Sequence, residues 1–191
     1  EIYPKPDTRN FNFDELETVM EGKHRPGHFN GVAQVVSKLF EMVQPDNAYF
    51  GLKDFQQLAI IKNMTKQLKL SVNIVSCPVI REENGLAMSS RNELLTTEQR
   101  ANAGIIFETL SKVKEQIGQK SVEQLKDWAI KNINKNPFLT VEYFEIVDDE
   151  RLQPVVNWNS EDTKVACVAA YCGKIRLIDN IILTDTASHA N

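Results

Sequence analysis

Two short polar segments of the 191-residue chain carry groups that suit a polyphosphate ligand. The first is residues 51–57 (GLKDFQQ), between an expected strand and an expected helix, where backbone amides and the helix dipole attract phosphate. Lys53 supplies a positive charge, Asp54 can accept hydrogen bonds from a ribose hydroxyl, and Gly51 permits a ligand to approach the backbone. Asp54 and Gln57 also have the spacing of a helix cap, so a structural role stays open.

The second segment is residues 88–91 (MSSR), which follow Gly85 in a stretch without helical or strand periodicity. Ser89 and Ser90 are hydroxyl donors and Arg91 is a guanidinium, so this loop suits a mobile clamp on a polyphosphate. Expulsion of pyrophosphate needs such donors, because the leaving group gains negative charge as its bond to the α-phosphorus breaks. A polar loop before a helix is the ordinary alternative, but two such segments favour a nucleotide-binding enzyme.

Other reactive side chains form no recognisable site. His24 and His28 have no third metal ligand nearby, and an ordinary loop role is the better interpretation of both. The cysteines are odd in number and lack zinc-type spacing, which favours inert thiols in a reducing compartment. They are Cys77, Cys167 and Cys172. Neither a glycine-flanked nucleophile turn nor a Walker-type loop is present, and the sequence predicts no metal site.

Composition and charge argue against several broad classes of function. Apolar residues make up 42% of the chain and charged residues 25%, both close to the average of folded soluble proteins. Lys and Arg number 22 against 26 Asp and Glu, so a large nucleic-acid surface is not expected. No apolar run approaches the roughly 20 residues needed to cross a bilayer. We therefore expect a cytoplasmic protein that binds neither nucleic acid nor membrane.

The first half of the chain alternates helix and strand. Apolar residues at steps of three and four predict a helix that ends before Pro45, with these residues on one face. They are Val32, Val35, Val36, Leu39, Phe40 and Val43. A buried strand is expected at 48–51, a helix from about 54 to 68, and a second strand at 72–75. Short strands separated by helices favour a parallel sheet, whose ligands lie beyond the carboxyl ends of the strands.

The pattern changes near residue 95, where a second domain is expected to begin. Thr96 and Gln99 have the spacing of a capping box, which predicts the start of a helix there. Another helix is expected at about 122–133. Three strands follow, at 139–147, 164–172 and 175–183. Because a turn at Gly173 suits a hairpin, this half is expected to form an antiparallel sheet.

Four segments of the chain, taken in order, form a specific combination. They are residues 25–32 (RPGHFNGV), 43–46 (VQPD), 50–58 (FGLKDFQQL) and 85–92 (GLAMSSRN). Together they resemble the pantothenate synthetase family, the pantoate–β-alanine ligases, and the likeness extends to the strand that contains residues 178–181 (IDNI). Taken singly, the last segment is only a variant of the KMSKS-type loop of related nucleotidyltransferases.

The resemblance implies an α/β fold that begins within a Rossmann-like, HIGH-superfamily nucleotidyltransferase domain with a parallel sheet. Residues 1–95 are then the rear portion of the nucleotide-binding domain, and residues 96–191 are a small α+β C-terminal domain with an antiparallel sheet. Family members begin with a strand and a HIGH-type motif that supplies catalytic histidines, and none of this precedes Glu1 here. We therefore expect the intact protein to be the ligase and this chain alone to be inactive.

The family's enzymes condense pantoate with β-alanine at the expense of ATP. The reaction passes through an enzyme-bound pantoyl adenylate, releases AMP and pyrophosphate, and belongs to pantothenate and coenzyme A biosynthesis. The resemblance thus implies pantoate, β-alanine and ATP as small-molecule partners, Mg²⁺ bound mainly through the ATP phosphates, and a homodimer.

The resemblance also implies roles for the residues of the first segment. Gly51, Leu52, Lys53 and Asp54 contact ATP. Lys53 lies on the phosphates as a catalytic residue, Gly51 and Asp54 lie near the ribose, and Gln57 hydrogen-bonds pantoate. Leu52 stands where the family usually has Glu, which leaves a backbone contact as its role.

In the second region the resemblance implies that Ile80 meets the adenine side through its backbone. Met88, Ser89, Ser90 and Arg91 close over the nucleotide. The last three are catalytic in this interpretation, because they steady the departing pyrophosphate.

Two other functions stay open. The same fold could transfer AMP or CMP to a phosphate-bearing acceptor, although the neutral amide of Gln57 suits a hydroxy acid better. A non-catalytic interaction or dimerisation module would expose an apolar patch and show no ATP-induced protection of residues 51–57 and 85–91.

Overall fold

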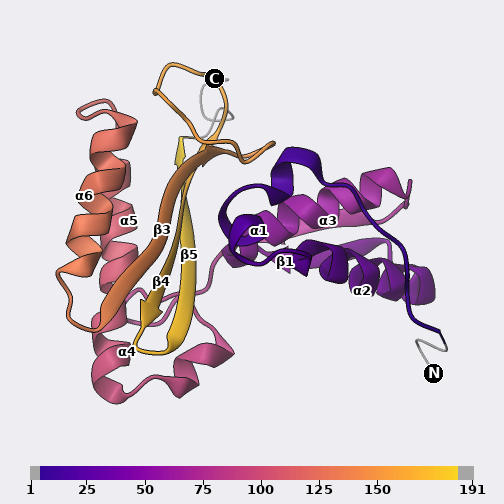
Figure 1. Cartoon of the computed structure of the whole chain (residues 1–191), viewed down its shortest axis with the longest axis horizontal. Coiled ribbons are helices and arrows are strands. Elements are labelled where there is room, and N and C mark those ends of the chain that lie inside the picture. Colours follow the sequence, from indigo (N-terminus) through magenta and orange to yellow (C-terminus); the bar gives the residue numbers. More distant parts are fainter. Residues whose placement is uncertain (1–4, 185–191) are drawn as a thin grey trace. The chain divides into compact units, whose positions relative to one another are not determined.

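A computed structural model describes residues 5–184 of the chain (Figure 1), which divides into two compact units, Glu1–Cys77 and Pro78–Asn191. The first unit begins with a 3-10 turn, η1 (Asp14–Glu17), and a short helix, α1 (Met20–His24). Its remaining elements are α2 (His28–Val43), β1 (Asn47–Gly51), α3 (Phe55–Gln67) and β2 (Asn73–Cys77). β1 and β2 pair in parallel, with Gly51 opposite Cys77. The predicted alternation and the parallel sheet are confirmed.

Helix α2 forms as predicted, but its apolar residues occupy two faces and not one. The buried positions are Phe29, Ala33, Ser37 and Phe40. The exposed large apolar side chains of α2 are Val35, Leu39, Met42 and Val43. Apolar residues recur at steps of three and four on both faces of this helix. The periodicity therefore predicts the helix correctly but does not identify which face is buried. Strand β1, expected to be buried, is partly exposed, with Tyr49 at 68%.

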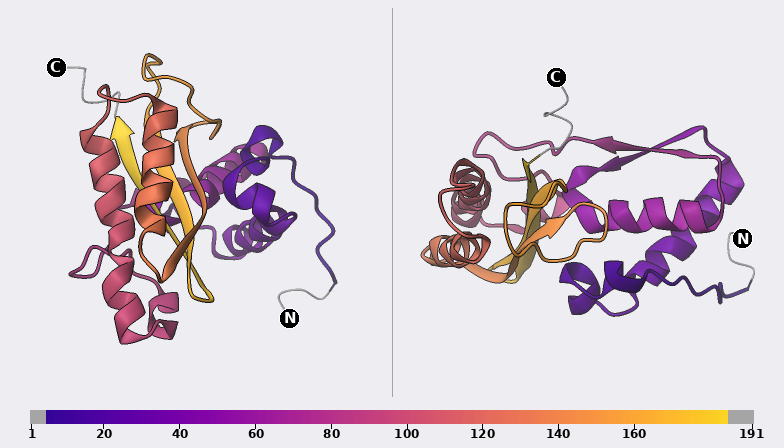
Figure 2. Two further views of the ribbon diagram at one scale, coloured as in Figure 1. Left: turned by 60° about the vertical axis from the view of Figure 1, so that its left-hand side comes forward. Right: turned by 90° about the horizontal axis from the view of Figure 1, so that it is seen from above.

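The second unit places helices on one face of an antiparallel sheet. Its helices are α4 (Thr97–Ala103), α5 (Ile105–Glu115) and α6 (Val122–Asn134), preceded by the 3-10 turn η3 (Ser90–Leu94). Its strands are β3 (Leu139–Asp148), β4 (Lys164–Cys172) and β5 (Ile175–Thr184), in the order β3-β4-β5. Figure 2 shows α5 and α6 side by side against the sheet. The three strands and their hairpin at Gly173, whose φ is +58°, are confirmed.

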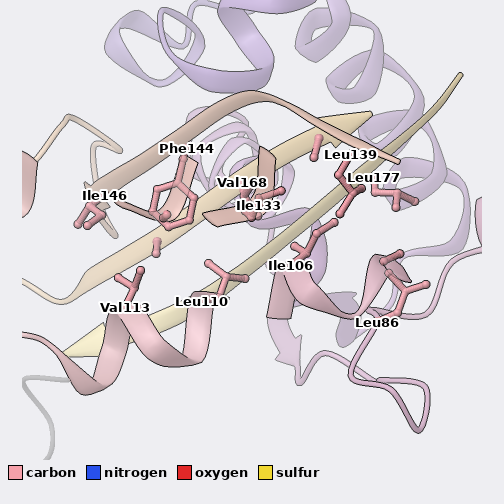
Figure 3. Close-up of a cluster of buried hydrophobic side chains, with 14 of the residues drawn as sticks. Leu86, Ile106, Leu110, Val113, Ile133, Leu139, Phe144, Ile146, Val168 and Leu177 are labelled. Carbon is pink, nitrogen blue, oxygen red and sulfur yellow. The ribbon is translucent and has the colours of Figure 1, made fainter. Parts of the chain in front are cut away.

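The core of the second unit lies between these helices and the sheet (Figure 3). Leu110 and Val113 of α5 pack with Phe144 of β3 and Val168 of β4, all fully buried. The predicted capping box is present, because Gln99 N donates to Thr96 Oγ1 at 3.2 Å and Thr96 N donates to Gln99 Oε1 at 3.0 Å. The helix that it starts ends at Ala103, and α5 begins after Gly104.

The boundary between the compact units lies earlier in the chain than residue 95. Leu86 and Leu95 are buried in the core of the second unit. Arg81 also forms a bidentate ion pair with Asp179 of β5, with N–O distances of 2.6 and 3.1 Å. Residues 78–95 therefore pack with the antiparallel sheet, and the domain boundary expected near residue 95 stays a prediction.

The α/β fold class is confirmed, with a parallel two-stranded sheet followed by a separate antiparallel three-stranded sheet. Across residues 5–184, no helix combines the length and the apolar character needed to span a bilayer.

Candidate functional site

The 51–57 segment lies where β1 ends and α3 begins. A 3-10 turn of Leu52–Asp54 (η2) joins the two, so the segment stands at the carboxyl end of a parallel strand and at a helix N-terminus. A Cβ built on Gly51 meets no other atom within 4 Å, which leaves open space beside this backbone. Lys53 is half-buried and Asp54 is exposed. The local geometry is the one that the sequence predicted.

The predicted cap between Asp54 and Gln57 does not form. Asp54 occupies the N-cap position of α3, with φ −92° and ψ 60°, and its carboxylate makes no capping hydrogen bond. Within residues 5–184, the half-buried amide of Gln57 has no hydrogen-bond partner. Both polar groups are therefore available to a ligand.

The neighbouring Gln56 has a structural role that the sequence did not separate from that of Gln57. Its buried amide accepts from Glu21 N at 2.9 Å and donates to Leu16 O at 2.6 Å and to Val19 O at 3.0 Å. These bonds hold the chain before α2 against the first turn of α3. Of the two adjacent glutamines, Gln57 alone retains an unused amide.

We expect Asp54→Ala to lower the free energy of unfolding by less than about 0.5 kcal/mol, because no cap bond is lost. Thr96→Ala is the matched positive control, and removal of its capping box should cost about 1 kcal/mol. Urea denaturation followed by circular dichroism measures both values. A loss as large as that of Thr96→Ala would assign Asp54 to the helix cap.

His28, expected from the sequence to lie in a loop, is the first residue of α2 and lies close to charged groups of the same unit. The pKa of His28 lies below its ordinary value of 6.5, first because burial disfavours the charged form and next because Arg25 is positive. Glu21, which pairs with Arg25 at 3.5 Å, and Asp54 act in the opposite direction. His28 is therefore neutral at pH 7 and within electrostatic reach of the Asp54 carboxylate. In the sequence, only the family motif at residues 25–32 indicated that His28 lies near the candidate site.

In the second unit, the 88–91 segment follows a short hairpin. Arg81 and Ala87 form an antiparallel bridge, and Met88 N donates to Ile80 O at 2.9 Å. The turn of this hairpin uses Gly85, whose φ of +87° favours glycine. The carbonyl of Ile80 is thus held in place, while its side chain is 65% exposed.

The polar groups of the 88–91 segment are accessible. Ser89 caps η3, because its Oγ accepts from Arg91 N at 3.2 Å, which leaves the hydroxyl hydrogen free to donate. Ser90 and Arg91 are exposed, and the Arg91 guanidinium has no ion-pair or hydrogen-bond partner among the described residues. Met88 is 54% exposed. The segment therefore offers two hydroxyls and one unpaired cation on a fixed turn.

Charged side chains anchor this turn. Arg81, besides its pair with Asp179, lies over the Phe107 ring, with Cζ 3.6 Å from the ring centroid. Glu82 accepts from Arg100 Nε at 2.8 Å and from Arg100 Nη2 at 3.0 Å. These bonds place the hairpin on the sheet and on α4.

The Glu82–Arg100 pair should make the second unit sensitive to acid. Hydrogen bonds from Arg100 are the main cause that holds the pKa of Glu82 below its ordinary value of 4.5. A lowered pKa means that the stabilisation is complete above 4.5 and is lost as the pH falls through the lower folded-state value. Between about pH 6 and about pH 3, the melting temperature should fall more for the unmodified protein than for Glu82→Gln. Equal falls would show that the pair contributes nothing.

The predicted site residues form two sets, one within each unit: Gly51, Leu52, Lys53, Asp54 and Gln57 in the first, and Ile80, Met88, Ser89, Ser90 and Arg91 in the second. Within residues 5–184, no group of three or more His, Cys, Asp or Glu side chains gathers to coordinate a metal. The donors of both sets are hydroxyl, amide, ammonium and guanidinium groups, which bind phosphate and carboxylate oxygens.

The chain is similar to known proteins over almost its whole length. The family described as pantoate-beta-alanine ligase matches residues 1–182. The pantothenate synthetase of Porphyromonas gingivalis is 55% identical over 185 residues, which make up 97% of this chain and 66% of that protein. That of Bacteroides fragilis is 53% identical over 181 residues, or 95% of this chain and 64% of that protein. The chain thus spans slightly less than two thirds of the length of these curated relatives.

Solved structures agree with the sequence matches. Pantothenate synthetase from Thermus thermophilus superposes with a TM-score of 0.88 at 38% identity, over 96% of this chain and 67% of that one. The ligase from Francisella tularensis, complexed with beta-gamma ATP and beta-alanine, superposes with a TM-score of 0.73 at 32% identity, over 97% and 62%. With its sequence matched from residue 1 to residue 182 and its fold shared with solved members, the chain belongs to the pantoate–β-alanine ligase family.

Proposed function

We propose that the protein condenses pantoate with β-alanine at the expense of ATP, through a pantoyl adenylate. A pantoate carboxylate oxygen attacks the α-phosphorus, the bond to the bridging oxygen of the β-phosphate breaks, and pyrophosphate leaves with the electron pair. The amine of β-alanine then attacks the acyl carbon, AMP departs, and the amine gives up a proton as the amide forms. Family membership supports this proposal, as do the side chains of Gln57 and Arg91, which have no partner within the described residues.

The first segment is assigned to binding and positioning. Lys53 binds the phosphates next to the N-terminus of α3, while Gly51 and Asp54 lie at the ribose and Leu52 contacts ATP through its backbone. Gln57 donates its free amide to pantoate. Holding the carboxylate and the α-phosphorus in line can lower the barrier by roughly 7–11 kcal/mol.

The second segment is assigned to the leaving group. Ser89, Ser90 and Arg91 donate to the phosphate oxygens that become pyrophosphate, and Met88 and the backbone of Ile80 lie at the adenine side. The main support for the proposed function is the exposed Arg91 guanidinium, which has no partner within the described residues. A cation without an ion pair breaks no existing interaction when it turns toward a developing negative charge.

The side chains of the two segments suit a magnesium ion that arrives bound to the ATP phosphates, because they bind phosphate oxygens and not the metal itself. When bound, it would shield the phosphate charge, and Lys53 with Arg91 would contact the remaining phosphate oxygens. Since the described residues gather no three acidic or imidazole side chains, phosphate oxygens and water would supply most of its ligands.

The proposal extends to the whole protein. The resemblance supports a cytoplasmic homodimer, which sedimentation of the full-length protein tests.

Hydrogen exchange with and without Mg-ATP tests nucleotide binding in the full-length protein. We expect slower amide exchange in residues 51–57 and 85–91, with no change in α6, which serves as the internal reference. A folded protein without protection in either segment would favour a non-catalytic interaction module.

A further inference from the structure

A single buried side chain joins the two ends of the 88–91 segment. Asn92 directly follows Arg91, is 1% exposed, and donates from Nδ2 to the carbonyl of Ala87 at 3.1 Å. Ala87 directly precedes Met88. The same Nδ2 donates to Glu82 Oε1 at 2.6 Å. One side-chain amide therefore joins the two ends of residues 88–91, which carry both hydroxyls and the cation. We call this closed base, formed by Ala87 and Asn92, the neck of the segment.

The neck is itself fixed to the rest of the second unit. Glu82 receives the two hydrogen bonds from Arg100 of α4, and Glu82 N donates to Leu86 O at 2.8 Å. Asn92 N donates to Ser89 O at 3.0 Å, which holds the turn from the inside. The position of the segment thus depends on the continuous series Arg100, Glu82, Asn92 and Ala87.

This arrangement leaves one polar atom unsatisfied. The side-chain oxygen Oδ1 of Asn92 is buried and has no hydrogen-bond partner within the described residues. A buried acceptor without a donor is destabilising, and an apolar residue at this position would avoid that cost. The two hydrogen bonds that the amide donates must offset this cost, and both of them hold residues 88–91 in place.

We propose that Asn92 is a positioning residue of the reaction. It acts through Ser89, Ser90 and Arg91, whose polar groups it holds in place from behind without contacting the nucleotide. This inference rests on the proposed function. The sequence predicts a mobile clamp here, and in the structure Asn92 holds the two ends of the segment while Met88, Ser90 and Arg91 stay exposed.

The test compares Asn92→Ala with Asn132→Ala in the full-length protein. Asn132 lies on α6 and donates to Thr109 Oγ1 at 2.9 Å, so its replacement removes an amide bond of the same unit away from the neck. Pantoate-dependent exchange of labelled pyrophosphate into ATP should have a maximal rate about 10²-fold lower for Asn92→Ala. The KM for pantoate should change by less than about threefold, and Asn132→Ala should match the unmodified protein in both constants.

Hydrogen exchange without any ligand tests the positioning itself. The amides of Arg91 and Asn92 donate within the turn, so they should exchange about tenfold faster in Asn92→Ala and unchanged in Asn132→Ala. If the alanine variant does not fold, Asn92→Ser replaces it, because a hydroxyl cannot span both acceptors. A folded variant of Asn92 with a normal rate of pyrophosphate exchange would overturn the inference. If the unmodified protein shows no pyrophosphate exchange, the proposed function fails instead, and unchanged amide exchange would separately refute the positioning role.

Discussion

Replacing Arg91 with alanine in the full-length protein is expected to slow pantoyl-adenylate formation by about 10²- to 10³-fold. The guanidinium is exposed and unpaired within the described part of the chain, so its removal costs little stability and acts on the reaction alone. Negative charge on pyrophosphate grows as the bond to the α-phosphorus breaks, and in the proposed function Arg91 is expected to stabilise that charge more than bound ATP. Single-turnover formation of the adenylate measures the effect.

Two further variants sharpen this prediction. Arg91→Lys keeps the charge but loses the bidentate geometry, so it should recover only part of the rate. Arg151→Ala removes another exposed arginine of the same unit, outside both segments, and should leave the rate unchanged. Pantoate binding should be nearly constant in all three proteins. An unchanged rate in Arg91→Ala would remove Arg91 from the mechanism.

Replacing Lys53 with methionine should lower the rate of adenylate formation by roughly a hundredfold. Lys53 lies in the turn between the carboxyl end of β1 and the first turn of α3, where the helix dipole already favours anions. Methionine retains most of the side-chain volume, so the variant tests the ammonium charge more than the packing. The maximal rate and the KM for ATP, measured by pyrophosphate exchange, report the loss.

Lys62→Met is the matched control, since Lys62 is an exposed lysine further along α3. It changes the net charge by the same amount and should leave both constants intact. If the two variants lose activity equally, the effect of Lys53 reflects general electrostatics and not phosphate contact.

The order and type of the elements were predictable because their signals are local. Periodicity and turn residues identified α2, β1, α3, β2 and the three strands of the second sheet. A capping box was found at Thr96, and a second one at Ser121 has the same signature three residues before Gln124. Such bonds lie within four residues, so sequence spacing alone specifies them.

Packing between distant residues was not predictable in the same way. The pair of Arg81 with Asp179 and the burial of Leu86 assign residues 78–95 to the second unit, and no local pattern contains that information. The buried face of α2 was equally ambiguous, because apolar residues line more than one side of the helix.

The candidate site shows the same division. The residue types of the two segments indicated a nucleotide, and the structure places them on a strand-to-helix turn and on an exposed loop. The roles of Gln56 and Asn92 were missed, because an amide in a sequence does not reveal whether its partners are ligands or backbone. For Gln56, the structural role is seen only in its three hydrogen bonds to backbone groups.

The proposed function depends on one step, the activation of the pantoate carboxylate by ATP. Exchange of labelled pyrophosphate into ATP by the full-length protein, with pantoate and without β-alanine, measures this half-reaction alone. We predict exchange that requires pantoate and that is slower by roughly a hundredfold or more in Arg91→Ala and Lys53→Met. A folded, ATP-binding protein that shows no pantoate-dependent exchange would contradict the acyl-adenylate mechanism and would favour nucleotidyl transfer to a phosphate-bearing acceptor.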